Sequence, residues 1–243
     1  MGSALTTAAL LNVWEHGLTE KPLQRALNLL AAAHPEASLQ QLQQLSIGQR
    51  DAQLIEIREA LYGEHLTCLV PCPQCGEQLE ITLDTRQLRS LPASPAGSHS
   101  LTVGDCEVQF RLPNSEDMLL IADLPDAARA RHTLFERCVR QAARAGEPLA
   151  AADLPEEVVT GIASRMAELD PQADIQIALD CPSCARHWST TFEISSYLWS
   201  EINAWAVRLL REVHRLARAY GWREADILAL SPLRRQFYLE LIG

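Results

Sequence analysis

Apolar residues recur at helical spacing near both ends of the chain. Residues 1–64 show this pattern in short segments, which predicts several short helices. Near the other end, apolar residues recur every three or four positions over about six turns, which predicts a long amphipathic helix. They are Leu198, Ile202, Trp205, Leu209, Val213, Leu216 and Tyr220. Gly221 is expected to end this helix, and two shorter helices are expected at 224–230 and from Ser231-Pro232 onward.

Cap signals mark several helix ends. Ser38 followed by Gln41 has the pattern of a capping box, which predicts a helix start there. Gly48 opens the next apolar repeat, and Gly63 is a plausible residue for ending it.

A partial alternation of apolar and polar residues occupies two pairs of short segments. The first pair is 65–70 and 78–83, and the second is 174–179 and 187–194. This alternation predicts four strands that form two β-hairpins.

The stretch between these hairpins has a mixed pattern. Residues 91–98 are rich in Pro, Ser and Gly and predict a loop, and 103–112 predicts a short strand pair. A short helix is expected near Met118, a longer helix over 126–143, and another from Leu154-Pro155 to Leu169.

Each predicted hairpin carries a Cys-Pro-x-Cys motif at its turn. The four cysteines are Cys72, Cys75, Cys181 and Cys184. Two Cys-x2-Cys turns supply the four thiolates of a structural zinc site, and four thiolates leave no open coordination position. The sequence therefore predicts one structural zinc ion that joins the two hairpins as a zinc ribbon.

Other interpretations of the cysteines carry less support. A redox Cys-x-x-Cys motif of the thioredoxin type needs a helix after the pair, whereas strands are predicted here. Cys68 lies close enough to be an alternative ligand, although a buried strand cysteine fits its position better. Cys106 and Cys138 lie in apolar segments and are expected to be core thiols.

These elements together predict a mainly helical α+β chain with a four-cysteine zinc ribbon that is split by a long mixed insertion. The expected organisation is a helical segment at 1–64, the split ribbon at 65–85 plus 173–194, an inserted subdomain at 86–172 and a helical segment at 195–243.

The composition is that of a soluble globular protein with an acidic balance. Hydrophobic residues make up 47% of the chain, and the net charge of −10 argues against nucleic-acid binding by the protein as a whole. No apolar run approaches the ~20 residues that a membrane span needs, and no signal peptide is expected. Seven cysteines, four of them in metal spacing, suit a reducing cytoplasm.

One face of the long C-terminal helix is basic. Arg208, Arg211, Arg215 and Arg218 follow one another at spacings of three and four residues. This stripe is interpreted either as a solvated face or as a contact surface for a protein partner, with nucleic acid the least favoured. Trp222 follows Gly221 and is expected to anchor the helix corner or to contact a partner.

No motif for catalysis is recognisable. The chain lacks a P-loop, a dinucleotide-binding Gly motif, a His-Glu-x-x-His pair and a Gly-x-Ser-x-Gly elbow. His187 and His214 have no accompanying nucleophile or open metal site, so structural roles are expected for them. The sequence therefore predicts a protein that is not an enzyme and has no small-molecule substrate.

The order of these blocks resembles the baseplate proteins of contractile-tailed phages, which also occur in phage-derived contractile injection systems. The likeness covers nearly the whole chain, and its most specific parts are the Tyr220-Gly221-Trp222 corner and the Leu230-Ser231-Pro232 cap. The other stretches that carry it are 10–17, 48–51, 72–76, 170–174, 181–184 and 198–202. Ala185 stands where the first knuckle has Gly76, which predicts slight strain in the second knuckle.

The resemblance implies a non-enzymatic structural or assembly role in a baseplate or its hub, with other baseplate proteins as partners. It also implies assembly in the bacterial cytoplasm, after which the protein either stays in the finished tail particle or leaves it. The alternative is a zinc-ribbon adaptor that binds nucleic acid or transcription proteins.

Overall fold

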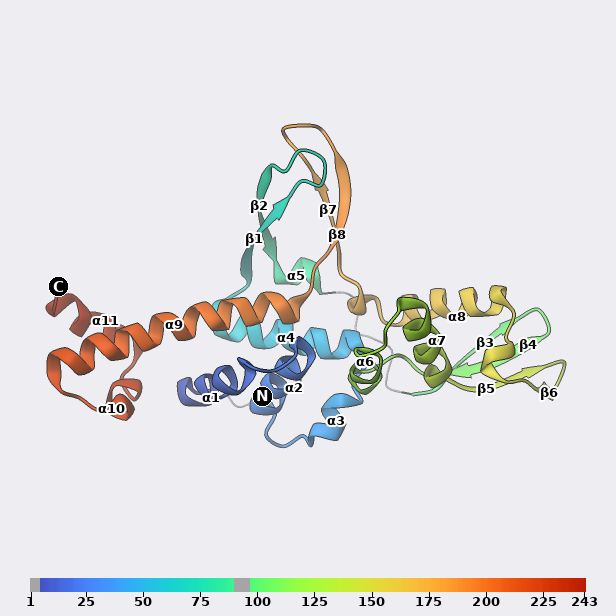
Figure 1. The fold of residues 1–243 in the computed structure, drawn as a ribbon, viewed down its shortest axis with the longest axis horizontal. Helices are drawn as coiled ribbons and strands as arrows, with labels where there is room; N and C mark the ends of the chain where they lie inside the picture. Colours follow the sequence, from blue (N-terminus) through green and yellow to red (C-terminus); the bar gives the residue numbers. More distant parts are fainter. Residues whose placement is uncertain (1–4, 90–96) are drawn as a thin grey trace. The chain divides into compact units, whose positions relative to one another are not determined.

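The computed structural model describes residues 5–89 and 97–243. The chain forms two compact units, one made of residues 1–36 and 195–243 and the other of residues 37–194. The expectation of a mainly helical chain with small antiparallel sheets is confirmed (Figure 1). Among the described residues, no helix combines the length and apolar character needed to cross a bilayer.

The regular elements of the first unit, among its described residues, are all helices. Its elements are α1 Thr7–Gly17, α2 Pro22–Ala33, α9 Ile194–Tyr220, α10 Glu224–Leu228 and α11 Pro232–Leu241. The long amphipathic helix predicted from the sequence is α9, and Gly221 follows it with a φ of 69°. The Ser231 side chain accepts a hydrogen bond from the N–H of Arg234, which confirms the predicted N-cap of α11.

Two apolar clusters hold α9 in this unit. Leu11 of α1 packs against Ala206 and Leu209 of α9. Near the C-terminal end of α9, Leu216 packs with Ile227 of α10 in a cluster that α11 completes. The periodic apolar residues of α9 therefore face α1, which is distant in the sequence, and the adjoining helices α10 and α11.

A glycine lets an aromatic ring approach α1 closely. A Cβ atom on Gly17 would overlap with the Trp199 ring of α9. The Arg25 guanidinium lies 4.6 Å from the centre of the same ring, and its Nε–H donates to the Gly17 carbonyl oxygen at 2.7 Å. Two of the stretches that carry the family resemblance, 10–17 and 198–202, therefore meet at this stack.

The second unit contains the remaining elements. In chain order they are α3 Leu39–Gln43, α4 Ile47–Tyr62, β1 His65–Pro71, β2 Gln78–Asp84, α5 Thr85–Leu88, β3 His99–Val103, β4 Cys106–Phe110, α6 Ser115–Ile121, α7 Ala127–Cys138, β5 Val139–Arg144, β6 Glu147–Pro148, η1 Ala151–Asp153, α8 Glu156–Leu169, η2 Pro171–Ala173, β7 Gln176–Asp180 and β8 His187–Thr191. The capping box of Ser38 and Gln41 is confirmed, and Gly63 ends α4 with a φ of 86°.

The inserted sheet differs from its prediction. The expected strand pair at 103–112 is β3 and β4, and β3 begins earlier, at His99. The expected helix over 126–143 is wrong over residues 139–143, because the helix ends at Cys138 and the chain continues as β5. The reason is tertiary pairing, since β5 lies antiparallel to β4 and completes a sheet in the order β3-β4-β5-β6.

The core of the insertion lies between this sheet and α8. Phe110 and Val108 of β4 are buried against Ile162 and Val158 of α8. Cys106 is buried in this cluster and Cys138 is buried at the end of α7, so both are core thiols as expected. Most of the predicted loop at 91–98 lies outside the described residues, and Gly97 and Ser98 belong to no helix or strand.

A buried carboxylate caps the start of α6. Asp117 is fully buried, and its carboxylate accepts hydrogen bonds from Arg111 Nη2 at 2.8 Å and from Arg137 Nε at 2.7 Å. It also accepts the N–H of Asn114 in a capping box. Burial alone would raise the pKa of Asp117, but the two guanidinium groups and this N–H together lower the pKa below its ordinary value of 3.8.

The first turn of α4 is capped by Asp170, a residue that directly follows α8. The N–H of Gly48 donates to Oδ2 of the buried Asp170 at 2.9 Å. This contact brings together the stretches 48–51 and 170–174, which both carry the family resemblance. A carboxylate in this position is also favourable for the α4 dipole.

Substitution of Gly48 by Ala is expected to destabilise the second unit by about 2–3 kcal/mol. A Cβ atom at this position would overlap with the Asp170 carboxylate, so the cap would have to move. Urea unfolding followed by circular dichroism measures the effect. The matched control is Gly161→Ala in α8, where the new Cβ would meet only side-chain atoms at 3.3 Å or more. Equal stabilities of the two variants would show that a Cβ atom at position 48 does not disturb the Asp170 cap.

Candidate metal centre

The two Cys-Pro-x-Cys turns are built alike. In the first, the N–H of Cys72 donates to the Glu77 carbonyl oxygen at 2.8 Å, and the N–H of Gly76 donates to the Cys72 carbonyl oxygen at 2.9 Å. In the second turn, the N–H of Cys181 donates to the Arg186 carbonyl oxygen and the N–H of Ala185 donates to the Cys181 carbonyl oxygen, both at 2.9 Å. Each turn therefore presents its two cysteines on a closed backbone loop at the end of a hairpin.

The third residue after each proline explains the strain predicted for the second turn. Gly76 has a φ of 74° and Ala185 a φ of 56°, so both turns need the left-handed backbone region. Glycine adopts this region without steric cost, whereas the Cβ of alanine is crowded there.

Substitution of Ala185 by Gly is accordingly expected to stabilise the hairpin pair by about 1 kcal/mol. Thermal unfolding in the presence of the metal measures the change. The control is Ala178→Gly in β7, which lies in a regular strand and should lose stability. A loss of stability in both variants would show that the conformation of Ala185 is not strained.

The structure brings the four predicted cysteine ligands together. Their Sγ atoms all lie within 4.8 Å of one another, although the two pairs are more than a hundred residues apart in the sequence. Cys72 Sγ lies 3.7 Å from Cys184 Sγ, and Cys75 Sγ lies 3.5 Å from Cys181 Sγ. A tetrahedral ion with bonds of about 2.3 Å to sulfur needs sulfur–sulfur separations of about 3.8 Å. All four thiols are free of disulfides, so the donor set fits one four-coordinate ion.

The electrostatics of the thiols also point to a cation. Burial would raise the pKa of Cys72, but the N–H groups of Cys75 and Gln74 directed at its sulfur lower the pKa to about 6. The N–H of Glu77 lowers the pKa of Cys75, yet the neighbouring sulfurs outweigh it and raise that pKa to about 12. One thiolate therefore forms readily while its neighbour resists ionisation. A cation between the sulfurs would favour the thiolate form of both cysteines.

Among the described residues, few other contacts join the two hairpins. β1 pairs only with β2, and β7 pairs only with β8, so each hairpin is a separate two-stranded sheet (Figure 1). Below the sulfurs lies a small apolar cluster, in which Leu79 and Ile81 pack with Trp188. Isolated two-stranded hairpins are marginally stable, so an ion held by the four sulfurs would add much to the stability of this part of the molecule.

Other candidates for ligands or catalytic groups lie apart from this centre. Cys68 is half-buried in β1 and does not belong to the four-sulfur group. His187 pairs with Asp180 across the second hairpin, and both side chains are exposed. His214 is exposed on α9. Within the described parts of the chain, no further group of three or more His, Cys, Asp or Glu side chains converges in this way.

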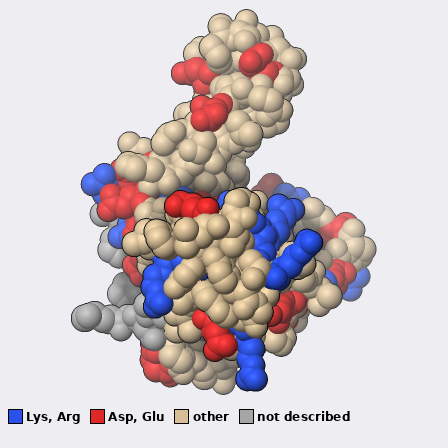
Figure 2. All heavy atoms as spheres, turned by 90° about the vertical axis from the view of Figure 1, so that its left-hand side faces the viewer, with Lys and Arg blue, Asp and Glu red and all other residues tan. Residues whose placement is uncertain are grey.

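The predicted basic stripe lies on the surface of α9. Arg208, Arg211, Arg215 and Arg218 are all exposed, and Arg215 donates to the Gly243 carbonyl oxygen at 3.1 Å. Figure 2 looks onto the end of the molecule where α10 and α11 lie in Figure 1, and basic side chains there stand in small groups among uncharged ones.

Trp222 lies half-buried in an aromatic cluster at the corner after α9. Its ring stacks on Tyr220, with centroids 4.6 Å apart, and meets Tyr238 of α11 edge-on at 4.9 Å. These contacts fit the expected role as a corner anchor, and they leave part of the ring exposed.

A second surface feature, an exposed apolar face of α11, was not predicted from the sequence. Leu233, Phe237 and Leu241 of α11 are 78%, 60% and 64% exposed. Their spacing of four residues places them on one face of the helix, and this spacing is the signal that could have revealed them. Adjacent exposed apolar side chains of this kind are typical of protein contact surfaces.

Comparison with known proteins agrees with these observations. The family model described as T4 bacteriophage base plate protein matches residues 10–199, and the match includes both cysteine pairs and the Gly48–Asp170 contact. No curated protein and no solved structure shows significant similarity to the chain. Since the family model covers well over half of the sequence, the chain belongs to the T4 bacteriophage base plate protein family.

Proposed function

We propose that the protein is a non-enzymatic structural or assembly component of the baseplate of a contractile tail or contractile injection system. The observation that carries this proposal is the convergence of four cysteine sulfurs from two distant hairpins, in a chain of the base plate family. A group with four sulfur donors fills the coordination shell of its ion, so it suits a structural role rather than catalysis.

The ion proposed for this centre is a single zinc held by Cys72, Cys75, Cys181 and Cys184. Zinc favours tetrahedral thiolate sites, and structural zinc can contribute on the order of 10 kcal/mol to folding. Since the hairpins share only a small apolar cluster, the ion would fix them to each other. The result would be a rigid pair of hairpins on which a partner protein could dock.

The proposed partners are other baseplate proteins, and the first unit offers surfaces for them. The exposed arginines of α9 and the exposed part of Trp222 suit polar and aromatic contacts, because Arg and Trp are enriched in protein interfaces. The exposed apolar residues of α11 add to this surface. Assembly in the bacterial cytoplasm and a place in the tail particle follow from the same proposal.

The runner-up is a zinc-ribbon adaptor for nucleic acid or transcription proteins. Its support is the hairpin architecture and the arginine stripe. The hairpins themselves, however, carry Glu77, Glu80 and Asp180 but only one arginine, Arg186. In Figure 2 the part formed by the hairpins shows acidic and no basic side chains on the visible face. A phosphate backbone would be repelled by such a surface, so protein partners are favoured.

Mass spectrometry of purified tail particles and of tagged-protein pull-downs tests the proposed function. Recovery of the protein in finished particles would establish a structural component. Recovery only with unassembled baseplate subunits would establish an assembly factor. Recovery with RNA polymerase or nucleic acid, and with no tail protein, would contradict the proposal and favour the adaptor.

A further inference from the structure

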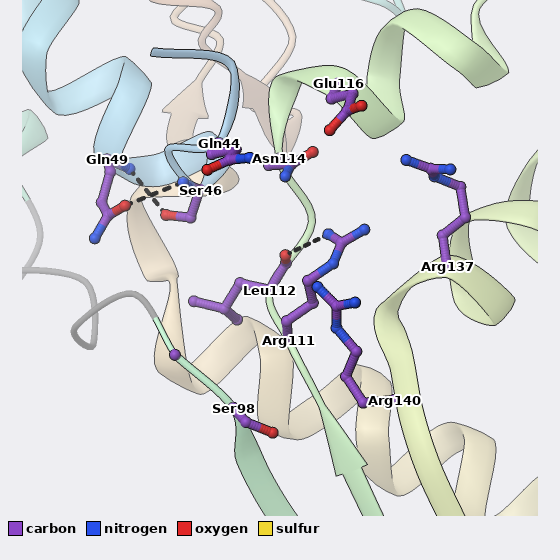
Figure 3. A pocket seen from close by; sticks show the side chains of 11 residues that line it. Gln44, Ser46, Gln49, Ser98, Arg111, Leu112, Asn114, Glu116, Arg137 and Arg140 are labelled. Carbon is purple, nitrogen blue, oxygen red and sulfur yellow. Dashed lines mark hydrogen bonds between the residues drawn. The ribbon is translucent and has the colours of Figure 1, made fainter. Parts of the chain in front are cut away.

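A pocket with a volume of about 610 Å³ lies in the second unit, apart from the cysteines. Its walls come from the start of α4, the end of β4, the start of α6 and the junction of α7 with β5 (Figure 3). The N–H of Ile47 donates to the Pro113 carbonyl oxygen at 3.2 Å, and this bond holds the starts of α4 and α6 side by side. The pocket is therefore part of the folded framework of this unit.

Three arginines form one wall of the pocket. In Figure 3, Arg111, Arg137 and Arg140 lie on the side of the pocket that is opposite Gln44 and Gln49. Arg111 and Arg137 share the single carboxylate of Asp117, so the two guanidinium groups together carry one more charge than the carboxylate that both of them bind. The Arg140 side chain is exposed and makes no hydrogen bond or ion pair with the described residues.

The remaining N–H groups of these arginines are available to a ligand. Arg137 uses its Nε–H on Asp117, and neither of its terminal NH2 groups bonds to a described residue. The acidic side chain in the pocket wall is Glu116, which is exposed to solvent. In a protein with a net charge of −10, the pocket is thus a local site of positive charge.

The amide side chains of the pocket add further donors. The Gln49 side-chain oxygen accepts the N–H of Ser46 at 3.1 Å, and the Asn114 side-chain oxygen accepts the N–H of Asp117 at 3.0 Å. Both capping interactions occupy the oxygen and leave the NH2 group of the amide as a donor. The pocket is therefore rich in donors and poor in acceptors.

We propose that this pocket binds a carboxylate group of a protein chain, either an acidic side chain or a C-terminal carboxylate. Planar guanidinium groups pair with carboxylates through two parallel hydrogen bonds, and Arg111 already binds Asp117 in this manner. The volume has room for one or two side chains, and the acidic balance of the whole protein disfavours a polyanion such as nucleic acid. This inference names a contact chemistry that the proposed baseplate role does not supply, and it does not depend on the metal.

The test is NMR of arginine side-chain N–H signals in the full-length, metal-loaded protein. The probes are Nα-acetyl-glutamyl amide for a side-chain carboxylate, Nα-acetyl-alanine for a terminal carboxylate, the neutral Nα-acetyl-glutaminyl amide, and inorganic phosphate. We expect saturable shifts of Arg137 and Arg140 with one or both carboxylates and none with the neutral analogue, and the tighter carboxylate identifies the source. Tighter saturation by phosphate, or equal shifts with the neutral analogue, would overturn the proposal.

Arg140→Gln is the informative variant, because Arg140 supports no other described residue and its loss should leave the fold intact. Its affinity for the carboxylate probe should fall about tenfold, as expected for the loss of a charge-assisted hydrogen bond. The matched control is Arg131→Gln, an exposed arginine of α7 that does not line the pocket. Equal affinities of the two variants would assign the shifts to general ionic effects and overturn the proposed site.

Discussion

Replacement of Cys72 or Cys181 by Ser is expected to release the metal and to loosen both hairpins at once. Each substitution removes one of four sulfurs that lie within 4.8 Å of one another, so either hairpin loses its link to the other. Because no strand hydrogen bonds join the two sheets in the described part of the chain, up to about 10 kcal/mol of metal-coupled stability is at risk. Metal content by elemental mass spectrometry and amide hydrogen exchange in β1, β2, β7 and β8 measure the two effects.

Cys68→Ser is the matched control for this experiment. Cys68 lies in the same hairpin as Cys72 but outside the four-sulfur group, so its substitution should leave the metal content unchanged. Full metal occupancy with wild-type melting in either Cys72→Ser or Cys181→Ser would contradict a shared site. Loosening of only the mutated hairpin would also contradict it.

Replacement of Asp117 by Ala is expected to cost about 3–5 kcal/mol in the second unit. The substitution leaves Arg111 and Arg137 without their shared counter-charge and removes the acceptor for the N–H of Asn114. Urea unfolding at neutral pH measures the loss. Glu116→Ala is the matched control, since that neighbouring side chain is exposed and its removal should change stability by less than about 1 kcal/mol.

The contribution of Asp117 to the free energy of unfolding should also depend on pH, in a defined direction. Its pKa in the folded protein is lower than its ordinary value of 3.8, so its contribution is fully present above pH 3.8. The contribution is lost as the pH falls below 3.8 and through the pKa of the folded state. The stability difference between wild type and Asp117→Asn should therefore shrink as the solution is acidified through this range. A difference that stays constant would mean that the charge of Asp117 does not stabilise the fold.

Much of the local structure could be predicted from the sequence because its signals are local. The capping box of Ser38, the N-cap of Ser231 and the apolar repeat of α9 each depend on neighbours within a few turns. The cysteine spacing predicted the convergence of two distant turns because metal coordination imposes one geometry on such pairs. The left-handed conformation of Ala185 was foreseeable by comparison with Gly76.

The features that sequence reasoning missed depend on distant partners. β5 was predicted as helix because Leu134, Cys138 and Ala142 keep a helical spacing, and only the antiparallel pairing of Ala142 with Val108 decides for a strand. The arginine pocket could not be predicted either, because its wall combines residues from four segments between 44 and 140. The Gly48–Asp170 cap joins residues 122 positions apart, and its two ends appeared in the sequence only as separate family-like stretches.

X-ray absorption at the zinc edge of the purified protein tests the proposed four-sulfur zinc centre. We expect one zinc per chain with four sulfur neighbours at about 2.3 Å and no oxygen or nitrogen ligand. Absence of zinc, or a coordination shell with fewer than four sulfurs, would contradict the proposed structural centre.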